Sequence, residues 1–323
     1  MDELFEIKNY YYLGNYQAVV NEVNKRSKQL RAKQDAECYM YRAMIALGDC
    51  DMVLREIRES EANPSLQAVR LLASYTQSPN ANAETAVATV KKWLTDGVDY
   101  NNPIVQLVAS TIFYNESNYE DTLRILNKTD NLECMSLLVQ TYLKIDRLDL
   151  AEKQYAQMKS IDVDATPSLI ASTWIAITQG DEQVKVALSV FEELSEKYGP
   201  TSLLLNGRAT CEILLRRFEK AENLLLLSLE KNSKDPDTIA NLIACYIHMK
   251  KPVEVTNRYL SQLKSTSPKH HWLESQLHAE QSFDRSKTRF EIVLNCLGSI
   301  YRTIAFSCLG VVTLRIGKQI WRL

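Results

Sequence analysis

Two groups of side chains in this sequence have the types and spacing that could do chemistry. Cys245 and His248 lie one helical turn apart, the arrangement that a thiol nucleophile and its general base would need. His270, His271 and His278 lie in one short segment, and imidazole nitrogens are common metal ligands. These residues define two chemical hypotheses, a cysteine-dependent enzyme and a metal centre.

Neither hypothesis has the further residues that it requires. Cys245 and His248 belong to a segment with the pattern of an ordinary packed helix, and no third ligand stands in register with the histidines. The sequence has no Gly-x-Gly pair, as the glycine-rich nucleotide-binding loops would need, and no His-Glu-x-x-His motif. We therefore predict no catalytic residue, no metal site and no bound cofactor.

Composition limits the remaining classes. The net charge of −2 gives no basic face for the phosphates of a nucleic acid, so nucleic acid is not an expected partner. Only 9 glycines and 8 prolines occur in 323 residues, which favours helices joined by short loops. The 7 cysteines show no Cys-x-x-Cys spacing, and the first residues form no apolar signal segment. We expect a cytoplasmic protein with cysteines in its core.

A turn signal recurs along the chain at intervals close to 34 residues. Tyr16 and Cys50 are 34 residues apart, and so are Phe218 and Pro252, whereas Tyr119 and Leu148 are separated by only 29. Weaker turns in "SPNANAETA" and "QGDEQVKVA" fill the longer gaps. This period is typical of tetratricopeptide repeats. We predict an all-α solenoid of about eight helix–turn–helix repeats, several of them degenerate and one shortened.

Side-chain types at fixed positions of the repeat support this prediction. The second helix of a repeat carries a small alanine, which lets helices approach closely, and a larger residue four positions later that fills the space between repeats. One hairpin cannot bury its apolar side alone, so we expect the leucines of "RRFEKAENLLLLSLE" (residues 216–230) to lie mostly in the core between repeats. The alanine and the larger residue four positions after it are Ala151 with Tyr155, Ala187 with Phe191, and Ala221 with Leu225.

The first helices of such repeats line the concave side of a solenoid, where a partner segment can bind. The 34-residue template places eight residues there, and they are small or apolar with few charges. This composition favours a permanent partner that is buried hydrophobically. The predicted groove consists of Asn206, Thr210, Ile213, Leu214, Ala240, Ala244, Ile247 and His248.

Six segments, in order along the chain, together resemble the coatomer epsilon subunit family. They are "DELFEIKNYYYLGNYQ" at the start, "LQAVRLLA" at 66–73, "DRLDLAEKQ" at 146–154, "TSLLLNGRA" at 201–209, "EVTNRYLSQLK" at 254–264 and "FDR" at 283–285. The resemblance implies a non-catalytic tetratricopeptide scaffold of the COPI vesicle coat. It also implies binding to the C-terminal domain of the coatomer alpha subunit, and a peripheral place on Golgi and vesicle membranes during Golgi-to-ER and intra-Golgi transport.

The last part of the sequence departs from that family. We assign residues 1–285 to the solenoid and residues 286–323 to a divergent extension, in which six basic residues outnumber the single acid Glu291. Its uncharged stretches are shorter than the roughly 20 residues that a bilayer span requires, so we expect no transmembrane span. An alternative exon, or a gene-model artefact, is the interpretation favoured over an interfacial membrane-binding segment.

One alternative function comes from a different class of protein. A cochaperone or cytosolic adaptor of the tetratricopeptide type would capture short peptide segments. Domains that hold a peptide carboxylate carry a basic clamp in the groove, and the groove predicted here has none. The coat-scaffold hypothesis is therefore preferred.

Overall fold

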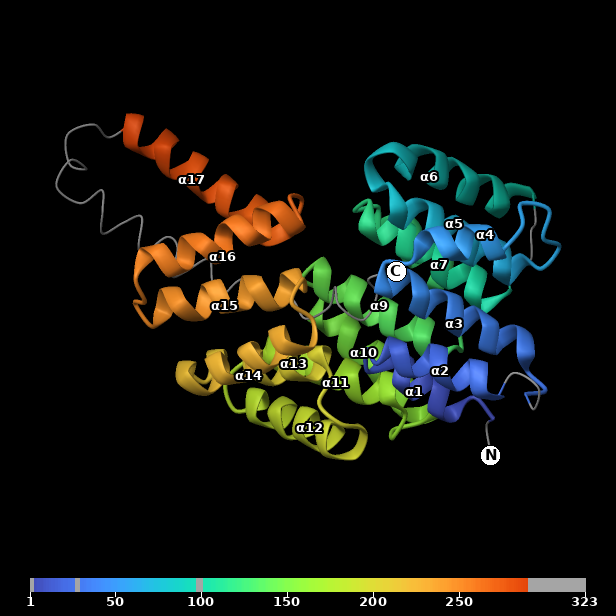
Figure 1. Ribbon diagram of the computed structural model, residues 1–323, viewed down its shortest axis with the longest axis horizontal. Coiled ribbons are helices and arrows are strands. Elements are labelled where there is room, and N and C mark those ends of the chain that lie inside the picture. The colour runs from blue at the N-terminus through green and yellow to red at the C-terminus, as the bar shows by residue number, and fades with distance from the viewer. Residues whose placement is uncertain (1–2, 27–29, 97–100, 290–323) are drawn as a thin grey trace. The chain divides into compact units, whose positions relative to one another are not determined.

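The computed structural model describes residues 3–26, 30–96 and 101–289, and every regular element among them is an α-helix (Figure 1). The predicted all-α fold is confirmed. The helices are α1 (Phe5–Tyr12), α2 (Tyr16–Arg26), α3 (Lys33–Leu47), α4 (Cys50–Glu56), α5 (Pro64–Gln77), α6 (Pro79–Asp96), α7 (Pro103–Asn115), α8 (Tyr119–Leu126), α9 (Leu132–Lys144), α10 (Leu148–Ile161), α11 (Thr166–Gln179), α12 (Gln183–Tyr198), α13 (Ser202–Leu214), α14 (Phe218–Lys231), α15 (Pro236–His248), α16 (Val253–Thr266) and α17 (His271–Arg289).

In chain order the described helices form eight successive pairs followed by α17, as the repeat predicts. Helices α2, α4, α8, α10 and α14 begin at the residues where the sequence signals a turn, and α16 begins one residue after Pro252. The short interval between Tyr119 and Leu148 has a simple cause, because α8 is only 8 residues long. A clipped second helix therefore shortens that repeat without breaking the series.

The tight turn inside a helix pair has a recurring backbone conformation. After α3, the Gly48 N–H donates to the Ile45 carbonyl and the Asp49 N–H donates to the Met44 carbonyl, which is the Schellman arrangement. It requires a residue with positive φ, and Gly48 has a φ of 93°. The same position after α7, α9, α13 and α15 is filled by residues other than glycine: Ser117, Asp146, Arg216 and Lys250.

Five of the first helices start at a side-chain cap, whereas α1 and α3 start without one. Asn63, Asn102 and Asn131 each accept a hydrogen bond from a backbone N–H in the first turn of the helix that follows. Thr201 and Asp235 do the same for α13 and α15. Pair boundaries are thus encoded locally, by a cap at one end and a left-handed residue at the turn.

The helices divide into two compact units, an N-terminal unit that ends at Gln179 and a C-terminal unit that begins at Gly180. The N-terminal unit contains α1 to α11, and its curvature brings its first helix into contact with its last. A buried hydrogen bond marks this contact, because the Thr166 hydroxyl on α11 donates to Asn9 Oδ1 on α1 at 2.7 Å.

The C-terminal unit contains α12 to α17 and packs as the repeat pattern predicts. Ala221 and Leu225 on α14 are fully buried in a cluster with residues of α13 and α15. Leu224 and Leu229 pack against the same cluster, whereas Leu226 and Leu227 face outwards with 36% and 48% of their surface exposed. The leucine-rich segment is therefore mostly core, with two exceptions on its outer face.

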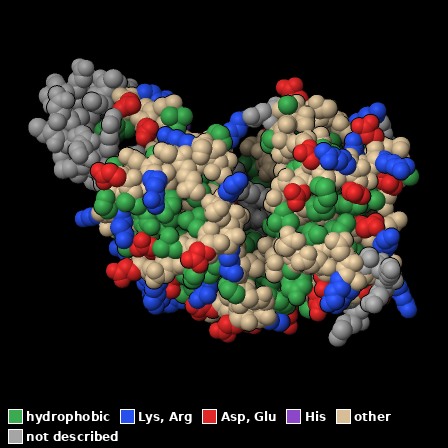
Figure 2. All heavy atoms as spheres, viewed as in Figure 1, with side chains coloured by type: hydrophobic (Ala, Val, Ile, Leu, Met, Phe, Trp, Pro, Cys, Tyr) green, Lys and Arg blue, Asp and Glu red, His purple; other side chains and the backbone are tan. Residues whose placement is uncertain are grey.

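Helix α17 continues to Arg289, past the expected solenoid boundary at Arg285. The rest of the predicted extension, residues 290–323, lies outside the described residues. None of the described helices combines the length and apolarity that crossing a bilayer demands. On the face seen in Figure 2, basic and acidic side chains are interspersed, in keeping with the small net charge.

Candidate partner-binding site

The eight residues of the predicted groove lie on α13 and α15, in positions that repeat at the 34-residue interval. Five of them are buried within the C-terminal unit: Asn206, Thr210, Ile213, Ala240 and Ala244. Leu214, Ile247 and His248 are half-buried. The surface that these positions offer to a partner therefore consists of the last three side chains, at the C-terminal ends of the two helices.

Asn206 holds α13 to α15. Its amide nitrogen donates to Asp235 Oδ2 at 2.9 Å and to the Thr238 hydroxyl at 2.5 Å, while its amide oxygen accepts from the Asn241 side chain at 3.1 Å. Asp235 is also the N-cap of α15. A buried amide satisfied in this way fixes the register of two neighbouring first helices. Its role is positioning, since little of its surface is left for a partner.

Ile213 and Ala240 belong to the hydrophobic core. Ile213 packs in the cluster with Ala209 and Leu242, and Ala240 packs in a second cluster with Trp272. The 34-residue template assigns both residues to the concave surface from their sequence positions alone. In the structure the first helices pack closely enough to bury them.

His248 and Cys245 are not arranged as a catalytic pair. The His248 ring stacks on Phe218 with centroids 5.0 Å apart and planes 6° from parallel. Burial, followed by the nearby charge of Arg216, lowers the pKa of His248. Burial raises the pKa of the Cys245 thiol to about 12, and the thiol donates to the Phe218 carbonyl oxygen at 3.2 Å. A nucleophilic cysteine needs a depressed pKa, so this environment acts in the opposite direction.

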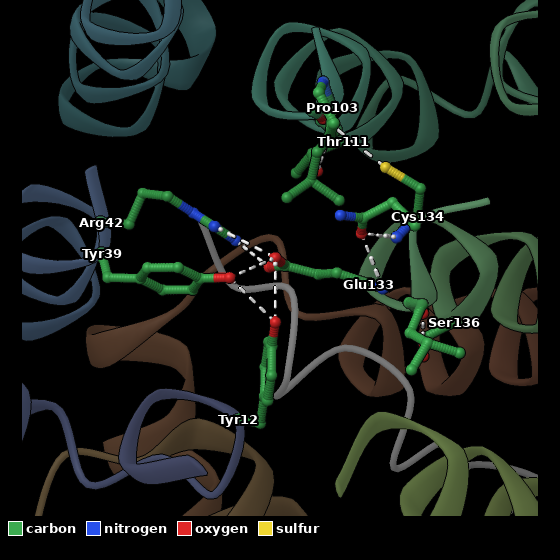
Figure 3. A network of polar contacts seen from close by, with 11 residues as sticks. Tyr12, Tyr39, Arg42, Pro103, Thr111, Glu133, Cys134 and Ser136 are labelled. Atoms are coloured by element: carbon green, nitrogen blue, oxygen red, sulfur yellow. Dashed lines mark hydrogen bonds and ion pairs between the residues drawn. The ribbon is translucent and has the colours of Figure 1, made fainter. Parts of the chain in front are cut away.

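A buried polar cluster in the N-terminal unit escaped the sequence analysis. Figure 3 shows Glu133 of α9 facing Arg42 and Tyr39 of α3 and Tyr12 of α1. The Arg42 guanidinium donates to both carboxylate oxygens, and the two tyrosine hydroxyls each donate to Oε2 at 3.3 Å. Arg42 is 1% exposed and Glu133 is 3% exposed. The carboxylate thus has four hydrogen-bond contacts inside the protein, one at Oε1 and three at Oε2.

The electrostatics of this cluster favour charged arginine and neutral tyrosines. Burial alone would lower the pKa of Arg42, but the Glu133 carboxylate opposes it and the pKa stays well above its usual value. Burial raises the pKa values of Tyr12 and Tyr39, and the Glu133 charge raises them further. Arg42 also lies 4.5 Å from the centroid of the Tyr11 ring, in a cation–π contact.

This cluster connects helices that are far apart in the chain. Arg42 and Glu133 are 91 residues apart, so their pairing requires the first two helix pairs to meet the fifth. The only sequence signal is a single charge in each of two apolar helical segments, "CYMYRAMIAL" and "LECMSLLVQTY". Nothing in a 34-residue period indicates that these two charges meet.

Stacked helix pairs with interhelical polar links define a protein of the helical-repeat class. A solved structure with a similar fold is titled "Crystal structure of APC/C hetero-tetramer Cut9-Hcn1". The matched region has a TM-score of 0.56 and 13% sequence identity, and it covers 84% of this chain. The chain spans about half the length of that protein, 55%, so the likeness concerns the fold alone.

Sequence comparison identifies the family. The family model "Coatomer epsilon subunit" matches residues 1–291. The coatomer subunit epsilon of Dictyostelium discoideum is 51% identical over 90% of this chain and 99% of its own length. Coatomer subunit epsilon-1 of Arabidopsis thaliana is 40% identical, covering 90% and 97%, and coatomer subunit epsilon of Caenorhabditis elegans is 32% identical, covering 88% and 97%. The chain belongs to the coatomer epsilon subunit family.

Family membership confirms two predictions made from the sequence. The chain is a non-catalytic subunit of the coatomer, the COPI vesicle coat, and the rest of that complex is its partner. As a coatomer subunit it is a structural scaffold and not an enzyme.

Proposed function

We propose that the chain binds the C-terminal domain of the coatomer alpha subunit, stabilising it and positioning it in the coat. The observation that carries this proposal is the family match over residues 1–291, with 51% identity to a coatomer epsilon subunit. Through the coat, the chain acts on the cytosolic side of Golgi and COPI vesicle membranes. Its transport steps are Golgi-to-ER retrograde and intra-Golgi transport.

The half-buried residues at the ends of α13 and α15 support an apolar contact with that partner. Leu214 and Ile247 present aliphatic side chains, and the stacked rings of Phe218 and His248 lie in the same unit. Apolar surface of this kind is characteristic of subunits that stay associated. We assign Leu214, Ile247 and His248 to the contact surface. The buried Asn206 and Ile213 hold the helices that carry this surface in position.

Co-expression with the C-terminal domain of a coatomer alpha subunit tests the proposal. Size-exclusion chromatography with light scattering should give one peak with the mass of a 1:1 complex. Two separate peaks would contradict the proposed partner and favour the peptide-binding adaptor. Immobilised peptides with free C-terminal carboxylates then provide the direct assay for that alternative.

The contact surface is tested with a double substitution, Leu214→Asp and Ile247→Asp. We expect it to weaken the complex at least tenfold, because two buried carboxylates would lose their hydration at the interface. Ile213 is unsuitable for this purpose, since it is 3% exposed and a charge there would unfold the unit.

A matched control is the double substitution Val186→Asp and Val253→Asp, which adds the same two charges at sites with 53% and 67% of their surface exposed. It should leave binding unchanged. Equal binding by the Leu214→Asp, Ile247→Asp variant and this control, with an intact circular dichroism spectrum, would remove α13 and α15 from the interface while leaving the alpha-subunit proposal in place.

A further inference from the structure

The histidines that lacked a third ligand in the sequence acquire one in the structure. Asp237 lies in the first turn of α15, and His270 and His271 lie at the start of α17. His270 Nε2 is 2.9 Å from Asp237 Oδ1, although the residues are 33 positions apart. One ligand atom from each of the three residues lies within 4.8 Å of the others.

The packing around this group holds it in place. The next residues of α17, Trp272 and Leu273, are buried in a cluster with Ile239 and Ile243 of α15. The side chain of His270 is 3% exposed and that of Asp237 is 11% exposed. His271 is half-buried, so it leaves the group open to solvent on one side. An ion can therefore reach two ligands that are already fixed by the core.

We propose that Asp237, His270 and His271 bind a divalent transition metal of the zinc type, which links α17 to α15. Two imidazole nitrogens and one carboxylate oxygen form a ligand set that zinc uses, with a fourth position left for water. Ligand atoms bound at the usual zinc distances of about 2.0–2.2 Å lie roughly 3.3 Å apart in a tetrahedron. The spacing between His270 and Asp237 is close to this value, and rotation of the His271 ring brings in the third ligand.

Metal binding replaces the proton between His270 and Asp237. The His270 Nδ1 atom accepts from the Trp272 N–H at 3.3 Å, which leaves Nε2 to donate to Asp237. When the metal occupies Nε2, the ring proton moves to Nδ1, and the long contact with the Trp272 N–H is lost. Metal binding therefore breaks two hydrogen bonds, the one between His270 and Asp237 and the longer one from the Trp272 N–H, and forms three coordination bonds across two helices.

Isothermal titration with zinc chloride tests this site in the full chain, without an affinity tag that contains histidine. Cys296 and Cys308 lie outside the described residues, so both are first changed to serine to remove their thiols. The five described cysteines are buried and cannot compete. We expect one zinc ion per chain, and visible absorption of the cobalt-loaded protein should show the intensity typical of tetrahedral coordination.

Three variants decide the assignment. His271→Ala and Asp237→Asn should each weaken zinc binding at least tenfold. His278→Ala, an exposed histidine on the same helix, should bind as the parent does. His271 is half-buried, so its variant remains informative if Asp237→Asn fails to fold. Parent-like affinity in His271→Ala with an intact circular dichroism spectrum, or no one-to-one binding by the parent, would overturn the proposal.

Discussion

The charge of Glu133 is balanced entirely within the protein. Its carboxylate accepts from Arg42 and from the hydroxyls of Tyr12 and Tyr39, and none of these groups has a substantial contact with water. Such a pair adds little net stability over an apolar pair of the same shape, but breaking it leaves one buried charge without compensation. The cluster should therefore be far more sensitive to loss of one member than a surface ion pair is.

We expect Glu133→Gln to lower the free energy of unfolding by about 3–5 kcal/mol, because Arg42 remains charged and buried. Urea denaturation followed by circular dichroism measures this difference. The matched control is Glu182→Gln, which removes the acid from an exposed pair with Lys185. That change should cost less than about 1 kcal/mol. Equal effects of the two substitutions would contradict the interpretation of the cluster.

The tyrosines of this cluster predict a loss of stability in alkali. Their pKa values are raised in the folded state, so the folded protein keeps its phenolic protons at a pH where the unfolded chain releases them. The contribution of these pKa shifts to the free energy of unfolding is complete below pH ~10, the usual tyrosine pKa, and is lost as the pH rises above it. Each tyrosine changes the free energy of unfolding by at most about 1.4 kcal/mol per pH unit.

A Tyr12→Phe, Tyr39→Phe double variant isolates this effect from the buried thiols, which also weaken folding at high pH. The stability difference between parent and variant should be constant from pH 7 to pH ~10 and should then shift in favour of the variant. Urea titrations at several pH values provide the measurement. Parallel pH profiles for the two proteins would show that the hydroxyls remain in contact with solvent.

At the scale of the elements, the turns inside helix pairs offer a test of backbone conformation. Lys250 has a φ of 55°, which is costly for a residue with a Cβ atom, while Gly48 fills the equivalent position at no such cost. Lys250→Gly should therefore raise the free energy of unfolding by about 0.5–1 kcal/mol after the entropy of glycine is counted.

Gly48→Ala is the reciprocal change and should lower stability by about 1 kcal/mol. No atom lies within 4 Å of the added Cβ, so this loss would report the backbone alone. Thermal denaturation of both variants gives the comparison. If both substitutions changed stability in the same direction, the positive φ of the turn would not be what determines their effects on the free energy of unfolding.

The contact between α12 and α13 depends on a missing side chain. A Cβ atom at Gly207 would lie 2.6 Å from the fully buried ring of Phe191. We expect Gly207→Ala to cost about 1–3 kcal/mol through overpacking. Adding Phe191→Leu should relieve the clash, so the double variant should be more stable than the sum of the single changes predicts. Additive losses in denaturation experiments would rule out direct packing between the two positions.

The sequence predicts the elements well because each one has a local cause. The residues that begin most of the second helices follow from turn signals, and the burial of Phe191 and Leu225 follows from the repeat. The groove was harder to predict, since Ile213 and Ile247 occupy the same template position but differ in burial. The pairing of Arg42 with Glu133 and of Asp237 with His270 depends on how separate helices pack in three dimensions, which no local pattern specifies.

At the scale of the whole molecule, the departure after the family-like region defines a simple experiment. Arg285 lies inside α17, so a truncation there would cut a helix, whereas a stop after Arg289 preserves it. We expect the chain of residues 1–289 to keep the melting temperature of the full chain and its affinity for the alpha-subunit domain. Loss of the complex on this truncation would assign a function to residues 290–323.

The long separation of Arg42 and Glu133 also affects how the chain is made. Most repeat proteins assemble from neighbouring hairpins, so each can fold soon after it leaves the ribosome. Here the arginine is synthesised 91 residues before its partner, an interval of about 5–18 s at ordinary elongation rates. During that time the Arg42 guanidinium and the two tyrosine hydroxyls lack the Glu133 carboxylate that accepts their hydrogen bonds in the folded protein. The polar cluster of the N-terminal unit therefore cannot form until α9 has been synthesised.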